Sequence, residues 1–210
     1  MGFPEMTKRP DEVFAETPSE AAGHDLWVFG YGSLMWNPGF PYIDHRPALL
    51  KGWHRSFCLW STRYRGTPQK PGLVLGLDCG GACRGVAFRV AASESDWTLA
   101  YLAERELTGY AYEPRMLRVE MDGANDAAPE EIQAYTFVAD RAHPLYAGPL
   151  SMDRAASIIM AAQGDAGLNR DYLINTLRQL EKHGFTDKSL HELLVEVERQ
   201  TGLIEQGAGI

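Results

Sequence analysis

Cysteine is scarce in this chain. Its 210 residues include three cysteines, Cys58, Cys79 and Cys83. A small, odd number of thiols in a chain of this size is typical of a reducing compartment and excludes a disulfide-stapled secreted domain. Cys79 and Cys83 enclose the tripeptide at residues 80–82, Gly-Gly-Ala, without a second cysteine or histidine pair nearby. We therefore expect a glycine turn between two strands there, and no metal site.

Long hydrophobic runs are missing as well. No apolar stretch approaches the roughly 20 residues needed to cross a bilayer. The N-terminus alternates proline, charged residues and alanine where a secretory signal would carry an apolar core. We expect no membrane span and no membrane partner, and a soluble chain that stays in the cytoplasm.

Positive charge is in deficit, with 20 Lys and Arg against 28 Asp and Glu and a net charge of -8. A negative net charge repels nucleic acids and anionic membranes unless a local basic patch overrides it. The densest basic segment contains only Arg63, Arg65 and Lys70. That is enough for one anionic small molecule and too little for a duplex, so we expect a small-molecule partner and no nucleic acid.

The composition suits one buried core, since 45% of the residues are hydrophobic and 23% are charged. Residues 1–24 are rich in proline and charge and lack a sustained period, which predicts a flexible N-terminal arm. Residues 25–210 are expected to form a single domain.

Short apolar or alternating runs dominate the first two thirds of that domain and predict strands. Gly, Pro, Asp and Asn clusters separate them. The predicted strands are Leu26–Gly30, Trp53–Trp60, Leu73–Leu77, Arg84–Val90, Met116–Met121 and Ile132–Val138. A helix is predicted within this series over Ser93–Thr108, with Ser93 as its N-cap and Gly109 as its stop.

Helical spacing takes over in the last third of the chain. The predicted helices are Ser151–Gln163, Asn169–His183 and Thr186–Thr201, and Gly184 and Gly202 stand where C-caps belong. Strands followed by helices give an α+β fold. We expect a mainly antiparallel, barrel-like mixed sheet with one inserted helix and C-terminal helices.

The most informative motif is the strand-to-turn segment VFGYGS at residues 28–33. Its two glycines let backbone amides approach an anion or an oxyanion closely. A dinucleotide fingerprint would need a third glycine where Met35 stands, and a nucleophile elbow around Ser33 would need glycines at Tyr31 and Met35. An amide-lined nest and a plain strand-ending turn both remain open on spacing alone.

Six ordered blocks of the chain resemble the ChaC-like γ-glutamylcyclotransferases. Together they extend from Trp27 to about Leu180 and leave out the N-terminal arm. The blocks are VFGYGSLMWNPGFPY (28–42), STRYRGTPQKPG (61–72), RGVAFRV (84–90), YLAERELTGY (101–110), YAGP (146–149) and NRDYL (169–173).

The resemblance implies the γ-glutamylcyclotransferase-like fold and an enzyme that splits glutathione into 5-oxoproline and cysteinylglycine. It implies that the catalytic carboxylate is Glu106, which follows an arginine shortly before a Gly-Tyr pair. The substrate-binding strand and loop that it implies are Val28, Phe29, Gly30, Tyr31, Gly32 and Ser33.

The chemistry of such a substrate requires little of the protein. Its own α-amine attacks its own γ-carbonyl, so the enzyme has to fold the glutamyl chain, accept a proton and stabilise an oxyanion. One carboxylate and one amide-rich loop suffice, and we expect no metal and no cofactor. Periodicity alone does not choose between Glu104 and Glu106 as that carboxylate, and the resemblance favours Glu106.

Two further residues of the matching blocks are candidates for substrate binding. Arg65 could bind a substrate carboxylate, although a solvated loop arginine is the alternative. Tyr146 could orient the substrate through its hydroxyl, as could Tyr31, Tyr110 or Tyr172, although a buried aromatic with one hydrogen bond is the alternative for each. Other γ-glutamyl amines or dipeptides are alternative substrates, and a non-catalytic γ-glutamyl-binding module is the alternative function.

Overall fold

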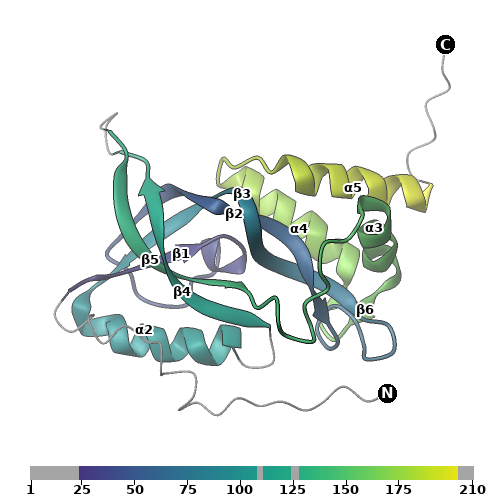
Figure 1. Ribbon diagram of the computed structural model, residues 1–210, viewed down its shortest axis with the longest axis horizontal. Coiled ribbons are helices and arrows are strands. Elements are labelled where there is room, and N and C mark those ends of the chain that lie inside the picture. Colours follow the sequence, from purple (N-terminus) through teal and green to yellow (C-terminus); the bar gives the residue numbers. More distant parts are fainter. Residues whose placement is uncertain (1–23, 108–110, 124–127, 203–210) are drawn as a thin grey trace. The chain divides into compact units, whose positions relative to one another are not determined.

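The computed structural model describes residues 24–107, 111–123 and 128–202 (Figure 1). The arm predicted over residues 1–24 lies outside this part of the chain, apart from His24, and so do Gly109 and Tyr110. The predictions for these residues therefore stay predictions.

Five strands form a closed barrel in the order β1-β3-β2-β4-β5. β1 pairs antiparallel with β3 and parallel with β5, and β2 pairs antiparallel with β4. The strands are β1 (Leu26–Gly30), β2 (Asp44–Ser61), β3 (Gly72–Val90), β4 (Tyr112–Met121) and β5 (Glu130–Ala139), and a separate two-stranded sheet joins β6 (Gln163–Gly164) and β7 (Gly167–Leu168). The predicted α+β class with a mainly antiparallel, barrel-like mixed sheet is confirmed.

The glycine turn predicted at residues 79–83 is wrong. The strands predicted on either side of it are one continuous strand, β3, and Gly80 and Gly81 lie inside that strand. Their φ angles are +99° and +69°, values that side chains disfavour and glycine accepts. The two glycines therefore accommodate a local irregularity within the strand instead of reversing the chain.

The chain divides into two compact units, one comprising Met1–Gly52 and Gly81–Val138 and the other Trp53–Gly80 and Ala139–Ile210. β2 and β3 each run from one unit into the other, so the units share strands. A single domain over residues 25–210 stays a prediction.

The first unit carries the inserted helix. The 3-10 turn η4 (Ala92–Glu94) leads into α2 (Ser95–Leu102), which continues as a π-helix, η5 (Ala103–Leu107). The predicted N-cap, Ser93, is wrong because this residue lies inside η4. The Asp25 carboxylate instead accepts the Ala92 N–H at 3.1 Å, so the capping acceptor comes from a residue distant in the sequence.

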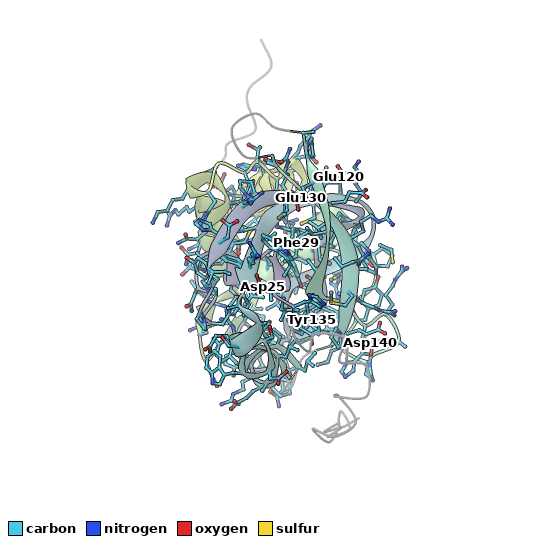
Figure 2. All side chains as sticks on the ribbon, turned by 90° about the vertical axis from the view of Figure 1, so that its left-hand side faces the viewer. Asp25, Phe29, Glu120, Glu130, Tyr135 and Asp140 are labelled. Carbon is cyan, nitrogen blue, oxygen red and sulfur yellow. The ribbon has the colours of Figure 1, made fainter. Side chains whose placement is uncertain are left out.

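Strand β1 is the buried centre of the first unit. Val28 and Phe29 have no exposed surface, and the Thr136 hydroxyl of β5 donates to the Phe29 carbonyl at 2.9 Å. Figure 2 shows Phe29 among the strands, with Tyr135 on the neighbouring β5. β1 is thus held along both of its edges, and its carboxyl end has a fixed position within this unit.

The second unit contains three helices that contact one another, α3 (Met152–Ala161), α4 (Asn169–Lys182) and α5 (Lys188–Thr201) (Figure 1). Ser151 and Asp187 cap α3 and α5, while Gly184 and Gly202 follow α4 and α5 with positive φ. The three helices predicted for this region are confirmed. In the described chain, no helix combines the length and the apolar character that crossing a bilayer requires.

Candidate active site

The glycine-rich segment forms the end of β1 and the turn that follows it. β1 stops at Gly30, and Ser33–Met35 form a 3-10 turn, η3, closed by the Met35 N–H on the Gly32 carbonyl at 2.9 Å. Within the segment, Val28 to Tyr31 are buried, Gly32 is half-buried and Ser33 is exposed. The buried part supports the loop, and Gly32 and Ser33 face the solvent.

Two glycines make this tight turn possible. A side chain at Gly30 would begin 3.1 Å from the Leu34 Cβ, because η3 folds back onto the strand. A side chain at Gly85 on β3 would begin 2.4 Å from the Gly30 carbonyl oxygen and 2.7 Å from the Phe29 ring. Sequence analysis did not identify Gly85, whose importance depends on the pairing of β1 with β3 and not on any local pattern.

The carboxylate of Glu106 lies on the π-helix η5. Its side chain is 16% exposed, whereas Glu104 on the same element is an exposed residue. Burial raises the pKa of Glu106, and the positive charge of Arg105 opposes that rise. π-helical turns are rare and occur often at functional sites. They also break the 3.6-residue period, so a helical wheel could not separate the two glutamates.

Arg105 connects this carboxylate with the glycine loop, all within the first unit. Its Nε lies 3.0 Å from Glu106 Oε1, and its Nη2 donates to the Ser33 hydroxyl at 3.1 Å. Its Nη1 donates to the carbonyls of Asn37 and Pro38 at 2.7 and 3.0 Å. The structure therefore brings Ser33 and Glu106 to one guanidinium group, which sequence analysis treated only as the residue before Glu106.

This arrangement has a defined chemical capacity. The Ser33 oxygen accepts a hydrogen bond from Arg105, which leaves the hydroxyl proton to donate elsewhere. The first N–H groups of a helical turn such as η3 have no partner inside the turn. Glu106 contributes a half-buried acceptor whose proton affinity is raised. Donors for an anion and an acceptor for a cation or a proton thus occur together.

Arg65 belongs to the second unit, where its guanidinium has partners of its own. Nη1 donates to the carbonyl of Ala166 at 2.5 Å, and the guanidinium carbon lies 5.1 Å from the centre of the Tyr172 ring. These contacts hold the loop of Arg65 against the hairpin of β6 and β7 within that unit. A role for Arg65 in binding a carboxylate stays a prediction.

Tyr146 also belongs to the second unit, in a network with two charged residues. Its hydroxyl donates to Asp78 Oδ2 at 2.7 Å and accepts from Arg141 Nε at 3.1 Å. The proton of the hydroxyl is therefore directed to Asp78, and the oxygen retains one lone pair for a further donor. Substrate orientation by Tyr146 stays a prediction, and the network limits it to accepting a hydrogen bond.

Metal-binding residues do not converge in the part of the chain that the structure describes. No group of three or more His, Cys, Asp or Glu side chains is placed there to hold an ion. The cysteines of the described chain form no disulfide, and burial raises the pKa of Cys58 to about 12. A thiol with such a pKa stays protonated near neutral pH and is a poor metal ligand.

Known proteins resemble this chain in sequence and in fold. The family model described as ChaC-like protein matches residues 26–200. The glutathione-specific gamma-glutamylcyclotransferase of Escherichia coli (strain K12) is 37% identical over 174 residues, which cover 83% of this chain and 73% of the relative. Gamma-glutamylcyclotransferase 2-3 of Arabidopsis thaliana is 34% identical over 178 residues, covering 82% and 88%.

A solved structure, described as a gamma glutamyl cyclotransferase specific to glutathione from yeast, shares the fold with a TM-score of 0.75. The match covers 84% of this chain and 97% of that one at 23% sequence identity, so it bears on the fold alone. The family model spans nearly the whole described part of the chain, including the glycine loop, Arg105 and Glu106. The chain therefore belongs to the ChaC-like protein family.

Proposed function

We propose that this protein is a γ-glutamylcyclotransferase that cleaves glutathione into 5-oxoproline and cysteinylglycine. One structural observation carries the proposal: a single guanidinium group holds the Ser33 hydroxyl and the half-buried Glu106 carboxylate in one site. The relatives in Escherichia coli and humans bear names that state glutathione specificity, and this supports glutathione as the substrate. The chain is expected to act in the cytoplasm, where glutathione keeps thiols reduced.

The glycine loop and Glu106 suit the two charged groups at the glutamyl end of such a substrate. The Ser33 hydroxyl and the amides of the η3 turn are donors for a carboxylate, or for the oxyanion formed at the γ-carbon. Glu106 is an acceptor for the α-ammonium group. Holding both groups would bend the flexible glutamyl chain so that its amine meets its own carbonyl, and positioning of this kind lowers the barrier to reaction.

Glu106 acts as a general base in the proposed reaction. It takes a proton from the α-ammonium group, because only the free amine has a lone pair with which to attack. The amine nitrogen then bonds to the γ-carbonyl carbon and the amide bond to cysteinylglycine breaks. The same carboxyl returns this proton to the leaving nitrogen. Once deprotonated again, it takes the second proton from the attacking nitrogen, and the freed amine of cysteinylglycine accepts that proton in turn. Protons and bonds balance without a metal ion or a redox cofactor.

A second candidate is the same reaction on other γ-glutamyl amines or dipeptides. The loop and Glu106 would bind the glutamyl half of the substrate, and the name of the Arabidopsis relative specifies no leaving group. A module that binds γ-glutamyl compounds without cleaving them is the alternative outside catalysis.

A product assay across several substrates separates these functions. The purified protein is incubated with glutathione, γ-glutamylalanine and γ-glutamylcysteine, and 5-oxoproline is quantified by mass spectrometry. We expect 5-oxoproline and cysteinylglycine in equal amounts from glutathione, at a kcat/KM well above that for the dipeptides. Comparable values for all three would support the broader specificity, and binding of glutathione without product would support the binding module.

A further inference from the structure

The contacts of Arg105 are too many and too specific for a surface residue. Its side chain is 19% exposed and contacts four segments of the first unit: its neighbour on η5, the end of α2, the glycine loop and the chain just after that loop. Arginine is suited to this task because its guanidinium presents five N–H donors in a rigid plane. Lysine cannot reproduce the geometry.

Most of these donors are already engaged inside the protein. Nε–H is directed to Glu106, both Nη1 hydrogens serve the carbonyls of Asn37 and Pro38 and the hydroxyl of Tyr101, and one Nη2 hydrogen serves Ser33. One N–H of Nη2 is left. Bidentate hydrogen bonding to a substrate carboxylate needs two parallel N–H groups that are both free, and this guanidinium has only one.

The segment that Arg105 holds is also fixed from the side of α2. Tyr101 accepts from Arg105 at 3.0 Å and lies so close to Gly39 that a Cβ there would be 2.0 Å from its hydroxyl oxygen. Trp97 stacks flat on the Tyr101 ring, with centroids 5.4 Å apart and planes 3° apart. Tyr101 is therefore held in place by packing, and it holds Arg105 in turn.

We propose that Arg105 is a positioning residue, which aligns the Glu106 carboxylate with the Ser33 hydroxyl and does not itself bind the substrate. The inference rests on the function proposed above. Arg105 fixes Glu106 through Nε and fixes the orientation of the Ser33 hydroxyl through Nη2, so the base and the anion donor keep a constant spacing. Its positive charge also keeps the half-buried carboxyl ionised at lower pH than burial alone would allow.

Among the charged groups around Glu106, Arg105 has the main influence on the pKa of its carboxyl. η5 packs against α2 and β4. These elements carry the titratable and charged side chains around Glu106. α2 carries Asp96 and Tyr101, and η5 itself carries the exposed Glu104. β4 carries Tyr112, Glu113, Arg115, Arg118 and Glu120. Arg115 pairs with Glu113 at 2.6 Å, Arg118 pairs with Glu131 and Glu120 pairs with Lys51, so the charges of β4 are largely compensated. The charge acting on the Glu106 carboxyl is that of Arg105.

The test compares Arg105→Lys and Arg105→Met with wild type, after wild type has been shown to form 5-oxoproline from glutathione. We expect kcat to fall at least 100-fold in Arg105→Met and at least 10-fold in Arg105→Lys, with KM changed less than threefold. The acidic limb of the kcat/KM profile should move to higher pH in Arg105→Met, because the carboxyl loses its neighbouring charge. It should stay near the wild-type position in Arg105→Lys, which keeps the charge.

Arg84→Met is the matched control. Arg84 forms a two-bond salt bridge with Asp122 in the same unit, at 2.7 and 2.8 Å, and is not part of the proposed site. Its kinetics should equal those of wild type. A large rise in KM with kcat preserved in Arg105→Lys would overturn the inference in favour of direct substrate binding, and wild-type kinetics in both Arg105 variants would overturn it outright. If Arg105→Met does not fold by circular dichroism, Arg105→Lys decides. An inactive wild type would instead refute the proposed function.

Discussion

In the proposed mechanism, the pH dependence of the reaction depends on a single side chain, Glu106. Burial raises the pKa of its carboxyl and Arg105 only partly offsets the rise. A general base acts in its deprotonated form, so activity should be lost as the pH falls through this raised pKa. We predict an acidic limb of kcat/KM for glutathione at a pH above the ordinary range of a glutamate, about 4.3.

The control for this prediction is Glu104→Gln, on the same element. Glu104 is exposed, so its removal should leave the position of the limb unchanged. An acidic limb at or below pH 4 in wild type would mean that the base is a solvated carboxyl elsewhere.

The sequence predicted some residues of the candidate site and not others. The glycine loop and Glu106 are predicted site residues on the basis of a family resemblance, because physical chemistry alone left the loop ambiguous between a nest and a plain turn. Arg105 was missed because its function depends on carbonyls of Asn37 and Pro38, more than 60 positions away, and on a π-helical turn. No local pattern predicts such a set of partners.

A buried asparagine gives a sharp prediction for the second unit. Asn169, with no exposed surface, donates to the Leu73 carbonyl and accepts from the Leu73 N–H, both at 2.7 Å. Its side chain thus replaces a neighbouring strand at the start of β3. Asn169→Ala would leave both backbone groups buried without partners, at a cost of about 1–3 kcal/mol for each unsatisfied group.

Urea unfolding measures this loss, which we expect to exceed 2 kcal/mol by the same principle. Asn175→Ala is the matched control, because Asn175 is exposed on the same helix, α4, and should change the unfolding free energy by about 0.5 kcal/mol or less. Equal stability of the two variants would show that the backbone of Leu73 finds other partners.

At the scale of elements, the contact between β1 and β3 supports the glycine loop. Gly85→Ala would place a methyl group 2.4 Å from the Gly30 carbonyl oxygen, and backbone cannot move aside as a flexible side chain can. Overpacking of this kind typically costs about 1–3 kcal/mol. We predict a lower Tm by differential scanning fluorimetry together with a lower kcat, since the displaced end of β1 carries the loop.

Trimming the other clashing group should not rescue this variant. Phe29→Leu removes the ring atom 2.7 Å from the new methyl group but leaves the Gly30 carbonyl in place. Recovery of Tm in the double variant would mean that the Phe29 ring, and not the backbone of Gly30, limits the approach.

The elements themselves were predictable to different degrees. The C-terminal helices followed from side-chain period and from caps such as Ser151 and Gly202, which are local signals. β3 was divided in two because Gly80 and Gly81 have the composition of a turn, and only the pairing of the whole strand distinguishes an irregularity from a reversal. The cap of the inserted helix escaped prediction because Asp25 supplies it from another strand end.

At the scale of the whole molecule, the proposed chemistry does not use the N-terminal arm. The family match begins at residue 26, and every residue assigned to the reaction follows it. We predict that a chain lacking residues 1–23 has a kcat/KM for glutathione within twofold of the full chain and the same number of protomers per particle by size-exclusion chromatography with light scattering. A tenfold loss of activity or a change in the number of protomers would assign the arm a part in catalysis or assembly.

The barrel was predictable as a class and not in its strand order. Alternating runs indicated a mainly antiparallel sheet, but the parallel pairing of β1 with β5 joins segments about 100 positions apart in the sequence, Val28 and Tyr135. That pairing closes the barrel around β1 and fixes where the glycine loop begins. Both features depend on long-range contacts.

The central claim is that Glu106 is the base for ring closure of a γ-glutamyl substrate. The most direct test measures the rate of 5-oxoproline formation from glutathione by three proteins: wild type, Glu106→Gln and Glu104→Gln. Removing a positioned general base typically costs about 10²–10⁴-fold in rate. We predict a loss of this size for Glu106→Gln, with glutathione binding retained by isothermal titration calorimetry, and wild-type turnover for Glu104→Gln. Substantial turnover by Glu106→Gln, or no 5-oxoproline from the wild-type protein, would contradict the account.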